Sequence, residues 1–293
     1  MVVEMRGVTK RYGQVLALDD IDLEIVGGDV VAILGPNGAG KTTAIDVMMG
    51  LRRPTGGSVR LFGEEPTRRA VRSRVGAMLQ DSGVPTALRV GEIVELFARY
   101  YPHALPHDEL LARADLTSVR RTLVSALSGG QKQRLYFALA IAGDPDLIFL
   151  DEPTVAMDVE ARRAFWTQVQ EFARLGKTIL FSTHHLDEAD AVARRIVVIH
   201  HGRLLAKGTP FEIKRLVADK TVRFASDVAV ERLTALPFVQ GARRDERHLV
   251  VYTSEPEELL RRLFDDGAAV ADLTVRDTDL EAAFVSLMGR AAA

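Results

Sequence analysis

The sequence predicts an α/β protein with a mainly parallel sheet covered by helices, joined to a smaller α+β unit at the C-terminal end. Three observations lead to this fold class. A glycine-rich loop, Gly35–Thr43, follows an apolar strand and precedes a helix. Strand and helix patterns then alternate up to about residue 210, as they do when helices connect parallel strands. The pattern changes after Pro210.

Composition narrows the class of protein. The chain is 47% hydrophobic and 27% charged, which is typical of globular domains. A net charge of −2 gives no overall basic field, so nucleic acid is not an expected partner. Cysteine is absent, which excludes disulfides and a cysteine nucleophile and fits a reducing cytoplasm. The sequence shows neither a signal peptide nor a membrane span, so we expect a chain that is soluble by itself.

The first 80 residues predict short strands around the glycine-rich loop. Apolar and polar residues alternate in Val2–Val8 and Ile21–Ile25, and the apolar run Val30–Leu34 leads directly into the loop. A helix is expected from Lys41 to about Gly50. Further strands are expected at 58–62 and 75–80.

The middle of the chain predicts a helical insertion and then regular alternation. Residues 91–124 show only helical periodicity. The elements expected after them are helices at 131–142, 159–175 and 186–194 and strands at 147–150, 177–182 and 196–199.

The residues after Pro210 predict a linking helix and a small α+β unit of ferredoxin-like type. Its expected elements are strands at 221–224, 248–253 and 270–275 and helices at 228–236, 257–264 and 279–288. We place the domain boundary so that the first domain covers 1–212, with a helical subdomain at about 82–140, and the second covers 213–293. A stabilising or dimerising role for the second domain is favoured over a ligand-binding role.

The glycine-rich loop matches the pattern G-x-x-x-x-G-K-[ST], which holds a polyphosphate. Its glycines let successive backbone N–H groups converge on phosphate oxygens, and the helix after it adds its positive dipole end. Lys41 is expected to reach the β- and γ-phosphates, and the Thr42 hydroxyl to hold Mg²⁺. The residues expected at the nucleotide are Gly35, Pro36, Asn37, Gly38, Ala39, Gly40, Lys41, Thr42 and Thr43.

Two carboxylates come after a strand in the middle of the chain. Leu147–Leu150 is apolar, and Asp151 and Glu152 come directly after it, at the end of the strand where ligands bind in parallel sheets. Phosphoryl transfer to water needs an acidic metal ligand and a group that orients or deprotonates the water. We assign Asp151 to Mg²⁺ and Glu152 as the general base. An acidic turn after a core strand is the alternative.

A second glycine pair precedes the helix at 131–142. Ser128, Gly129, Gly130 and Gln131 suit a helix start at which Ser128 is the N-cap and the backbone approaches an anion. A simple capped helix without a ligand is the alternative.

Taken in order, these motifs resemble those of the ATP-binding cassette transport ATPases over residues 1 to about 210. Gly35–Thr43 resembles the Walker A loop, Leu147–Glu152 the Walker B strand, and Leu127–Gln131 the signature motif. Gln80 resembles the Q-loop glutamine, and Thr183-His184 the switch-histidine loop. The family fold implies a P-loop NTPase core with an antiparallel β-subdomain and a helical insertion.

The resemblance gives further residues a role. Gln80 is expected to contact Mg²⁺ or the lytic water, and His184 the γ-phosphate; His185 beside it is the less favoured choice. Tyr12 is expected to stack on adenine, with packing in the first sheet as the alternative. One segment departs from the family pattern: Val155-Ala156-Met157 replaces a small residue followed by leucine before Asp158. We expect the loop facing the second subunit to work with altered packing.

In the family, the signature loop of one subunit closes on the Walker A loop of another, so the resemblance implies a homodimer that encloses ATP and Mg²⁺. It also implies separately encoded membrane permease subunits and a location at the cytoplasmic face of the membrane. The segments 181–190 and 277–284 are similar to those of bacterial drug and antibiotic exporters. We therefore expect an exporter ATPase. An importer subunit, a lipid or polysaccharide exporter, and a soluble cassette ATPase of translation or DNA repair are the alternatives.

Overall fold

A computed structural model describes the chain from residue 1 to 293, except residues 80–82, 217–219, 278, 282, 285–286 and 289–293. It divides into an N-terminal unit, Met1–Ala206, and a C-terminal unit, Lys207–Ala293. The division lies six residues before the domain boundary expected from the sequence, inside the last strand of the first sheet, which runs to Gly208.

The N-terminal unit contains a six-stranded sheet in the order β5-β6-β7-β3-β8-β9. The four neighbouring pairs from β5 to β8 are parallel. Its strands are β3 (Val30–Leu34), β5 (Val75–Met78), β6 (Leu147–Asp151), β7 (Thr178–Thr183), β8 (Arg195–His200) and β9 (Arg203–Gly208). Every residue of β3, β6 and β7 is buried, as expected for parallel strands covered on both faces.

A second, antiparallel sheet in this unit has the order β2-β1-β4. Its strands are β1 (Val3–Tyr12), β2 (Val15–Ile25) and β4 (Gly56–Leu61). Apolar residues from β1 and β2 share one core with β3 and with α1 (Lys41–Met48). The phosphate-binding loop therefore lies between two sheets that pack on the same helix.

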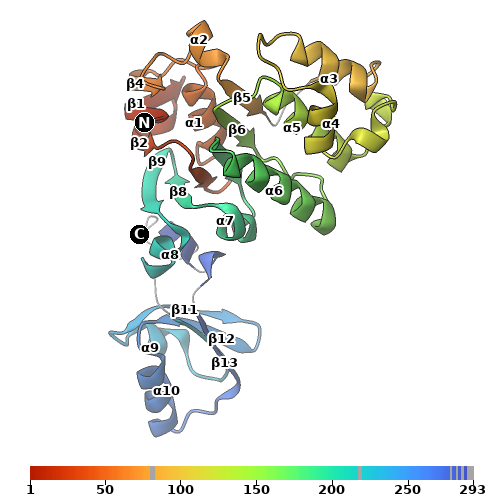
Figure 1. The fold of residues 1–293 in the computed structure, drawn as a ribbon. Coiled ribbons are helices and arrows are strands. Elements are labelled where there is room, and N and C mark those ends of the chain that lie inside the picture. Colours follow the sequence, from red (N-terminus) through yellow and green to blue (C-terminus); the bar gives the residue numbers. More distant parts are fainter. Residues whose placement is uncertain (80–82, 217–219, 278, 282, 285–286, 289–293) are drawn as a thin grey trace. The chain divides into compact units, whose positions relative to one another are not determined.

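Several helices of the N-terminal unit lie together beside the parallel sheet (Figure 1). The segment expected to be a helical insertion contains α3 (Val90–Ala98) and α4 (His107–Arg113), which contact each other and α5 (Gly129–Ile141). The longest helix, α6 (Val159–Arg174), packs aromatic residues between α5 and the sheet: Phe165 contacts Phe137, and Trp166 contacts Phe181. The short helices are α2 (Arg69–Arg72) and α7 (Leu186–Val192). No helix in the described part of the chain is long and apolar enough to cross a bilayer.

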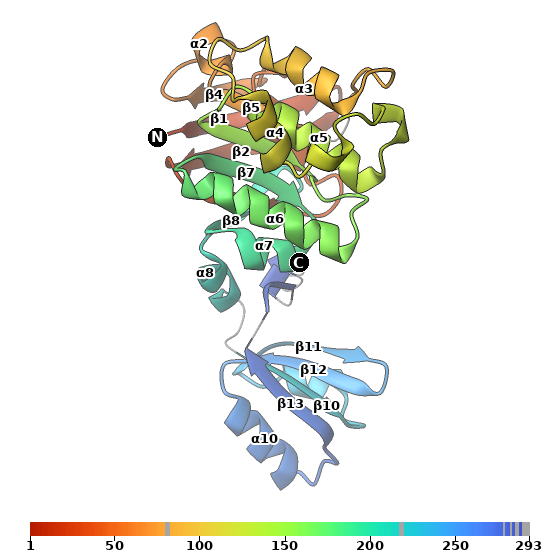
Figure 2. The ribbon, with the colours of Figure 1, turned by 45° about the vertical axis from the view of Figure 1, so that its right-hand side comes forward.

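The C-terminal unit begins with α8 (Pro210–Arg215) and then has the order βαββαβ of a ferredoxin-like domain. Its elements are β10 (Lys220–Ala225), α9 (Val230–Thr234), β11 (Val239–Asp245), β12 (His248–Thr253), α10 (Pro256–Asp265) and β13 (Ala271–Asp277). The sheet order is β11-β12-β10-β13, with every pair antiparallel. Figure 2 shows α10 lying along one face of this sheet.

Strand β11 was not expected from the sequence, because its polar residues and single glycine do not alternate with apolar ones over its length. It forms through its pairing with β12, whose six residues are all buried. The helix expected at 279–288 falls partly outside the described residues; those that are described from Leu280 to Met288 are helical.

Strand β5 packs closely against α5 at a glycine. A methyl group at Gly76 would lie 2.0 Å from the carbonyl oxygen of Ala140. We expect Gly76→Ala to lower the free energy of unfolding by about 1–3 kcal/mol, because strand and helix must move apart. Urea denaturation followed by the fluorescence of Trp166, the single tryptophan of the chain, measures this change in the N-terminal unit.

Gly83→Ala is the matched control, since no atom of the described residues, apart from its chain neighbours, lies within 4 Å of the added methyl group. An equal loss of stability in both variants would contradict the packing argument.

Candidate functional site

The phosphate-binding loop connects β3 to α1, and Gly40 is the N-cap of that helix. Gly40 has φ of 110°, and a methyl group on it would lie 2.6 Å from the carbonyl oxygen of Ala17. Only glycine fits both the angle and the space. The chain is thereby turned so that the first N–H groups of α1 are free of intrahelical partners beside the loop.

Lys41, the first residue of α1, is nearly buried and turns back into the loop. Its Nζ donates hydrogen bonds to the carbonyl oxygens of Gly35 at 2.8 Å and Pro36 at 3.3 Å. The same nitrogen lies 3.9 Å from Oε1 of Glu152. Burial lowers the pKa of Lys41, while the carboxylates of Glu152 and Asp151 act in the opposite direction.

Asp151 and Glu152 lie where the sequence places them, at the carboxyl end of β6. The Thr42 hydroxyl donates to Oδ2 of Asp151 at 2.9 Å. The Ser182 hydroxyl on β7 donates to Oδ1 of the same carboxylate. Ser182 also accepts a hydrogen bond from the backbone N–H of Glu152 at 3.0 Å. Both oxygens of Asp151 are thus held in place.

Ser182 was not among the residues expected at the site, although it is fully buried beside them. It is directly opposite Asp151 in the parallel pairing of β6 and β7. The rule that polar residues at the ends of neighbouring parallel strands meet at one edge could have identified it.

Glu152 and His184 form the second contact of the site. Nδ1 of His184 lies 2.8 Å from Oε2 of Glu152, with the histidine about half exposed and the glutamate nearly buried. Glu152 has φ of 49°, an uncommon angle for a residue other than glycine, which turns its side chain out of the line of the strand. The ring of His185 lies against that of His184, with centroids 4.1 Å apart.

A cavity of about 610 Å³ joins these groups. The residues expected from the sequence that line it are Asn37, Gly38, Gly40, Lys41, Thr42, Thr43, Glu152 and His184. Val155 lines it as well. Four further lining residues were not expected from the sequence: Val15, Leu16, Ala17 and His201. His201 comes directly after β8, so its place at the carboxyl edge of the sheet has the same origin as that of Asp151.

Of the residues expected at the nucleotide, Gly35, Pro36 and Ala39 do not line this cavity, and neither does Tyr12. Tyr12 lies at the end of β1 with its side chain partly exposed, and Nζ of Lys10 is 4.9 Å from the centroid of its ring. Gln80 lies outside the described residues.

The segment Ser128–Gln131 lines a different cavity, of about 320 Å³, together with Asp158 and its neighbours. Ser128 caps α5: its hydroxyl accepts from the N–H of Gln131 at 3.2 Å, and the Gln131 side chain accepts from the N–H of Ser128 at 3.0 Å. Asp158 caps α6 in a similar way, accepting from the N–H of Ala161 at 2.8 Å. Met157, part of the segment that departs from the family pattern, is buried beside this cavity.

Related proteins match this chain over nearly its whole length. Residues 18–155 match the family described as ABC transporter. A protein of Cupriavidus metallidurans named Nod factor export ATP-binding protein I is 34% identical over 99% of this chain and 98% of its own length. The protein of the same name from Burkholderia lata is 35% identical over 98% of this chain and 97% of its own length.

Solved structures agree with the relatives. The structure of an ATP-binding subunit of an ABC transporter superposes with a TM-score of 0.67 at 28% identity, covering 74% of this chain and 93% of that one. A dimeric ATP-binding cassette in a post-hydrolysis state, bound to ADP and Pi, gives a TM-score of 0.65 at 28% identity, covering 71% of this chain and 98% of that one.

The fold class expected from the sequence is therefore confirmed, and so is the resemblance. The phosphate-binding loop, the carboxylates after β6 and the relatives that match from end to end lead to one conclusion: this chain belongs to the ATP-binding subunits of ABC transporters, and it is an ATPase.

Proposed function

We propose that this chain hydrolyses ATP to drive the export of a substrate through separately encoded membrane permease subunits. The observation that carries the proposal is the match to export ATP-binding proteins over 99% of this chain, which includes the C-terminal unit as well as the cassette. The similarity of the segment 277–284 to drug exporters supports the same direction of transport. The proposal places the chain at the cytoplasmic face of the membrane through its permease.

The relatives and the tail segment indicate different exported substrates. The relatives are named for Nod factor, whereas the tail segment is similar to drug and antibiotic exporters. Nod factor export and drug export are both forms of export. We therefore propose export, with multidrug transport as one form of it. Import is the second candidate, but neither of the two relatives described above is named for import.

Glu152 is proposed as the general base for the attacking water. Its nearly buried carboxylate is within 2.8 Å of His184 and 3.9 Å of Lys41. These two neighbours hold the carboxylate beside the phosphate-binding loop, where a base for the attacking water is required. His184 would orient the water and donate to the γ-phosphate, and Lys41 would turn from its loop carbonyls to the phosphates.

Magnesium fits the remaining groups. The hydroxyl of Thr42 and the carboxylate of Asp151 are adjacent oxygen ligands, and Mg²⁺ typically takes one or two carboxylates together with substrate phosphates. We propose that Thr42 and Asp151 hold the ion, with Gln80 as a further ligand. Bound there, Mg²⁺ would neutralise charge on the phosphates. The hydrogen bond from Ser182 fixes the orientation of the Asp151 carboxylate.

The adenine is proposed to lie against Val15 and Ala17, which open β2 and line the cavity. Tyr12 ends the preceding strand and is separated from Val15 by a two-residue turn. Its ring is partly exposed, which leaves a face on which the base can stack.

The two cavities of the N-terminal unit support dimerisation around ATP. The loop at Gly35–Thr43 and the segment at Ser128–Gln131 line separate cavities, so a single chain does not bring them together on one nucleotide. Two chains related by a two-fold axis would complete both sites at once. The γ-phosphate would then hold the dimer closed, and hydrolysis would release it.

We expect Glu152→Gln to bind ATP normally and to hydrolyse it at least about 100-fold more slowly, because the amide cannot accept a proton. The variant should accumulate as a dimer in Mg-ATP, measured by size-exclusion chromatography with light scattering. Wild-type turnover by the variant would refute the role of Glu152, and a monomer at saturating ATP would refute the dimer.

The adjacent histidines provide a matched pair of variants. We expect His184→Ala to reduce the ATPase rate by about 10- to 1,000-fold, because the ring of His184 contacts Glu152. His185→Ala should retain most of the activity. A larger loss in His185→Ala than in His184→Ala would reverse the assignment.

Co-purification tests the transport partner. Affinity isolation of the tagged chain from solubilised membranes should bring down a polytopic membrane protein in stoichiometric amount. Recovery with ribosomes or DNA and without a membrane protein would instead support the soluble alternatives.

A further inference from the structure

The sheet of the C-terminal unit has two unlike faces. Val222, Phe224, Leu249 and Val251 face α9 and α10 and form the core of the unit. The opposite face carries Arg223 and other polar residues, and the segment that begins at Asp279 crosses part of it, with Ala283 packed against Val250 and Tyr252. Between this face and the segment lies a cavity of about 380 Å³, within the roughly 300–1,000 Å³ typical of small-molecule sites.

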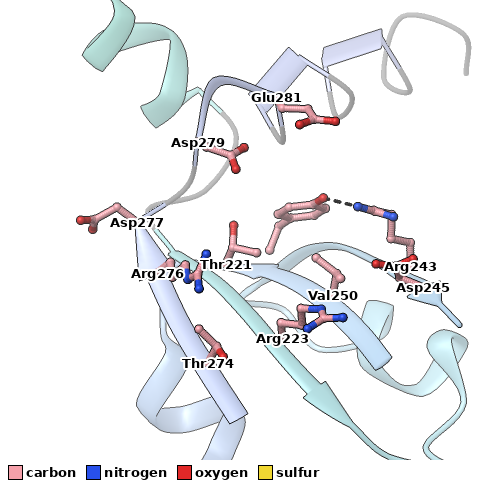
Figure 3. Close-up of a pocket in the computed structure, with 11 residues that line it drawn as sticks. Thr221, Arg223, Arg243, Asp245, Val250, Thr274, Arg276, Asp277, Asp279 and Glu281 are labelled. Atoms are coloured by element: carbon pink, nitrogen blue, oxygen red, sulfur yellow. Dashed lines mark hydrogen bonds between the residues drawn. The ribbon is translucent and has the colours of Figure 1, made fainter. Parts of the chain in front are cut away.

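Two arginines reach this cavity from neighbouring strands, Arg223 from β10 and Arg276 from β13 (Figure 3). Arg223 on β10 pairs with Thr274 on β13, and Arg276 on β13 pairs with Thr221 on β10. The two arginines are therefore diagonal neighbours on one face of the sheet, about 7–8 Å apart at their backbones.

Three of the carboxylates that line the cavity act on other cations. Asp277 accepts a hydrogen bond from Lys220 at 2.7 Å, which lowers its pKa. Asp245 and Glu281 act on Arg243, whose pKa is raised mainly by its hydrogen bond with the Tyr252 hydroxyl. Within the described part of the chain, neither Arg223 nor Arg276 forms an ion pair with a carboxylate.

Arg223 donates a hydrogen bond to a ring nitrogen of His248. Nη2 of Arg223 lies 3.0 Å from Nδ1 of His248, and a guanidinium can only donate, so this nitrogen accepts. The proton of the ring is then on Nε2, which lies 3.5 Å from Oδ2 of Asp272. His248 is nearly buried, and it fixes the orientation of Arg223 while leaving its charge available.

We propose that this cavity binds a small molecule through an anionic group, a carboxylate or a phosphate, held between Arg223 and Arg276. Guanidinium groups bind such planar or tetrahedral oxyanions in pairs of parallel hydrogen bonds. Thr221 and Thr274, the cross-strand partners of Arg276 and Arg223, line the same cavity. Asp279 and Glu281 on the opposite wall favour a molecule that also carries hydrogen-bond donors (Figure 3).

Calorimetric titration of the full-length protein tests the site. The nucleotide site is first filled with a non-hydrolysable ATP analogue and Mg²⁺, so that added anions do not bind at the Walker A loop. Inorganic phosphate and citrate are the two probes, one for each anion class. We expect saturable binding of at least one probe, at least tenfold weaker in Arg276→Gln and in Arg223→Gln.

Arg261→Gln is the matched control, since Arg261 lies on α10 at the other face of the sheet and bonds to Glu258. It should bind the probe as the wild type does. Without probe, Arg276→Gln should be as heat-stable as the wild type, because Arg276 forms no ion pair with a carboxylate in the described part of the chain, whereas Arg223→Gln also loses the hydrogen bond to His248. The proposal is overturned if neither anion binds, or if both cavity variants bind as tightly as the control.

Discussion

The parallel pairing of β6, β7 and β3 is the constraint on which the nucleotide site depends. Leu34 lies opposite Thr183, and Asp151 opposite Ser182, so three strands end at the same edge. The segments that leave this edge form the site: the phosphate-binding loop after β3, Glu152 after β6 and His184 after β7. A shift of one residue in this register would turn each polar group to the opposite face of the sheet.

The same pairing explains how much of the site could be predicted from the sequence. The loop and Glu152 come after short apolar runs, and a fully buried strand produces that pattern whatever its neighbours are. Ser182 and His201 were missed because their importance comes from which strands are adjacent. The order β6-β7-β3-β8 is a property of the whole sheet, and no local pattern in the sequence records it.

In the C-terminal unit most elements could be predicted from the sequence, but the candidate site could not. Its elements were expected apart from β11, and its fold type was expected too, but the arginine-lined cavity was not. Arg223 and Arg276 are 53 positions apart in the numbering, and they become neighbours only when β13 pairs with β10. Alternation along β10 does indicate that Arg223 faces away from Val222 and Phe224. It cannot indicate that a second arginine lies on the same face, because that depends on the register of another strand.

The geometry of the N-terminal unit also limits what one chain can do with ATP. Lys41 bonds to the carbonyl oxygens of its own loop, and Glu152 lies close to both Lys41 and His184. The charged groups thus satisfy one another within the chain. A nucleotide must replace the loop carbonyls as partners of Lys41, and burial, which lowers the pKa of that lysine, makes a phosphate oxygen a favourable replacement. Ser128 lies in a different cavity, so in the dimer proposed above the second chain would cover the exposed face of the phosphates bound by the first. Binding of the nucleotide would then prepare the surface on which the two subunits meet.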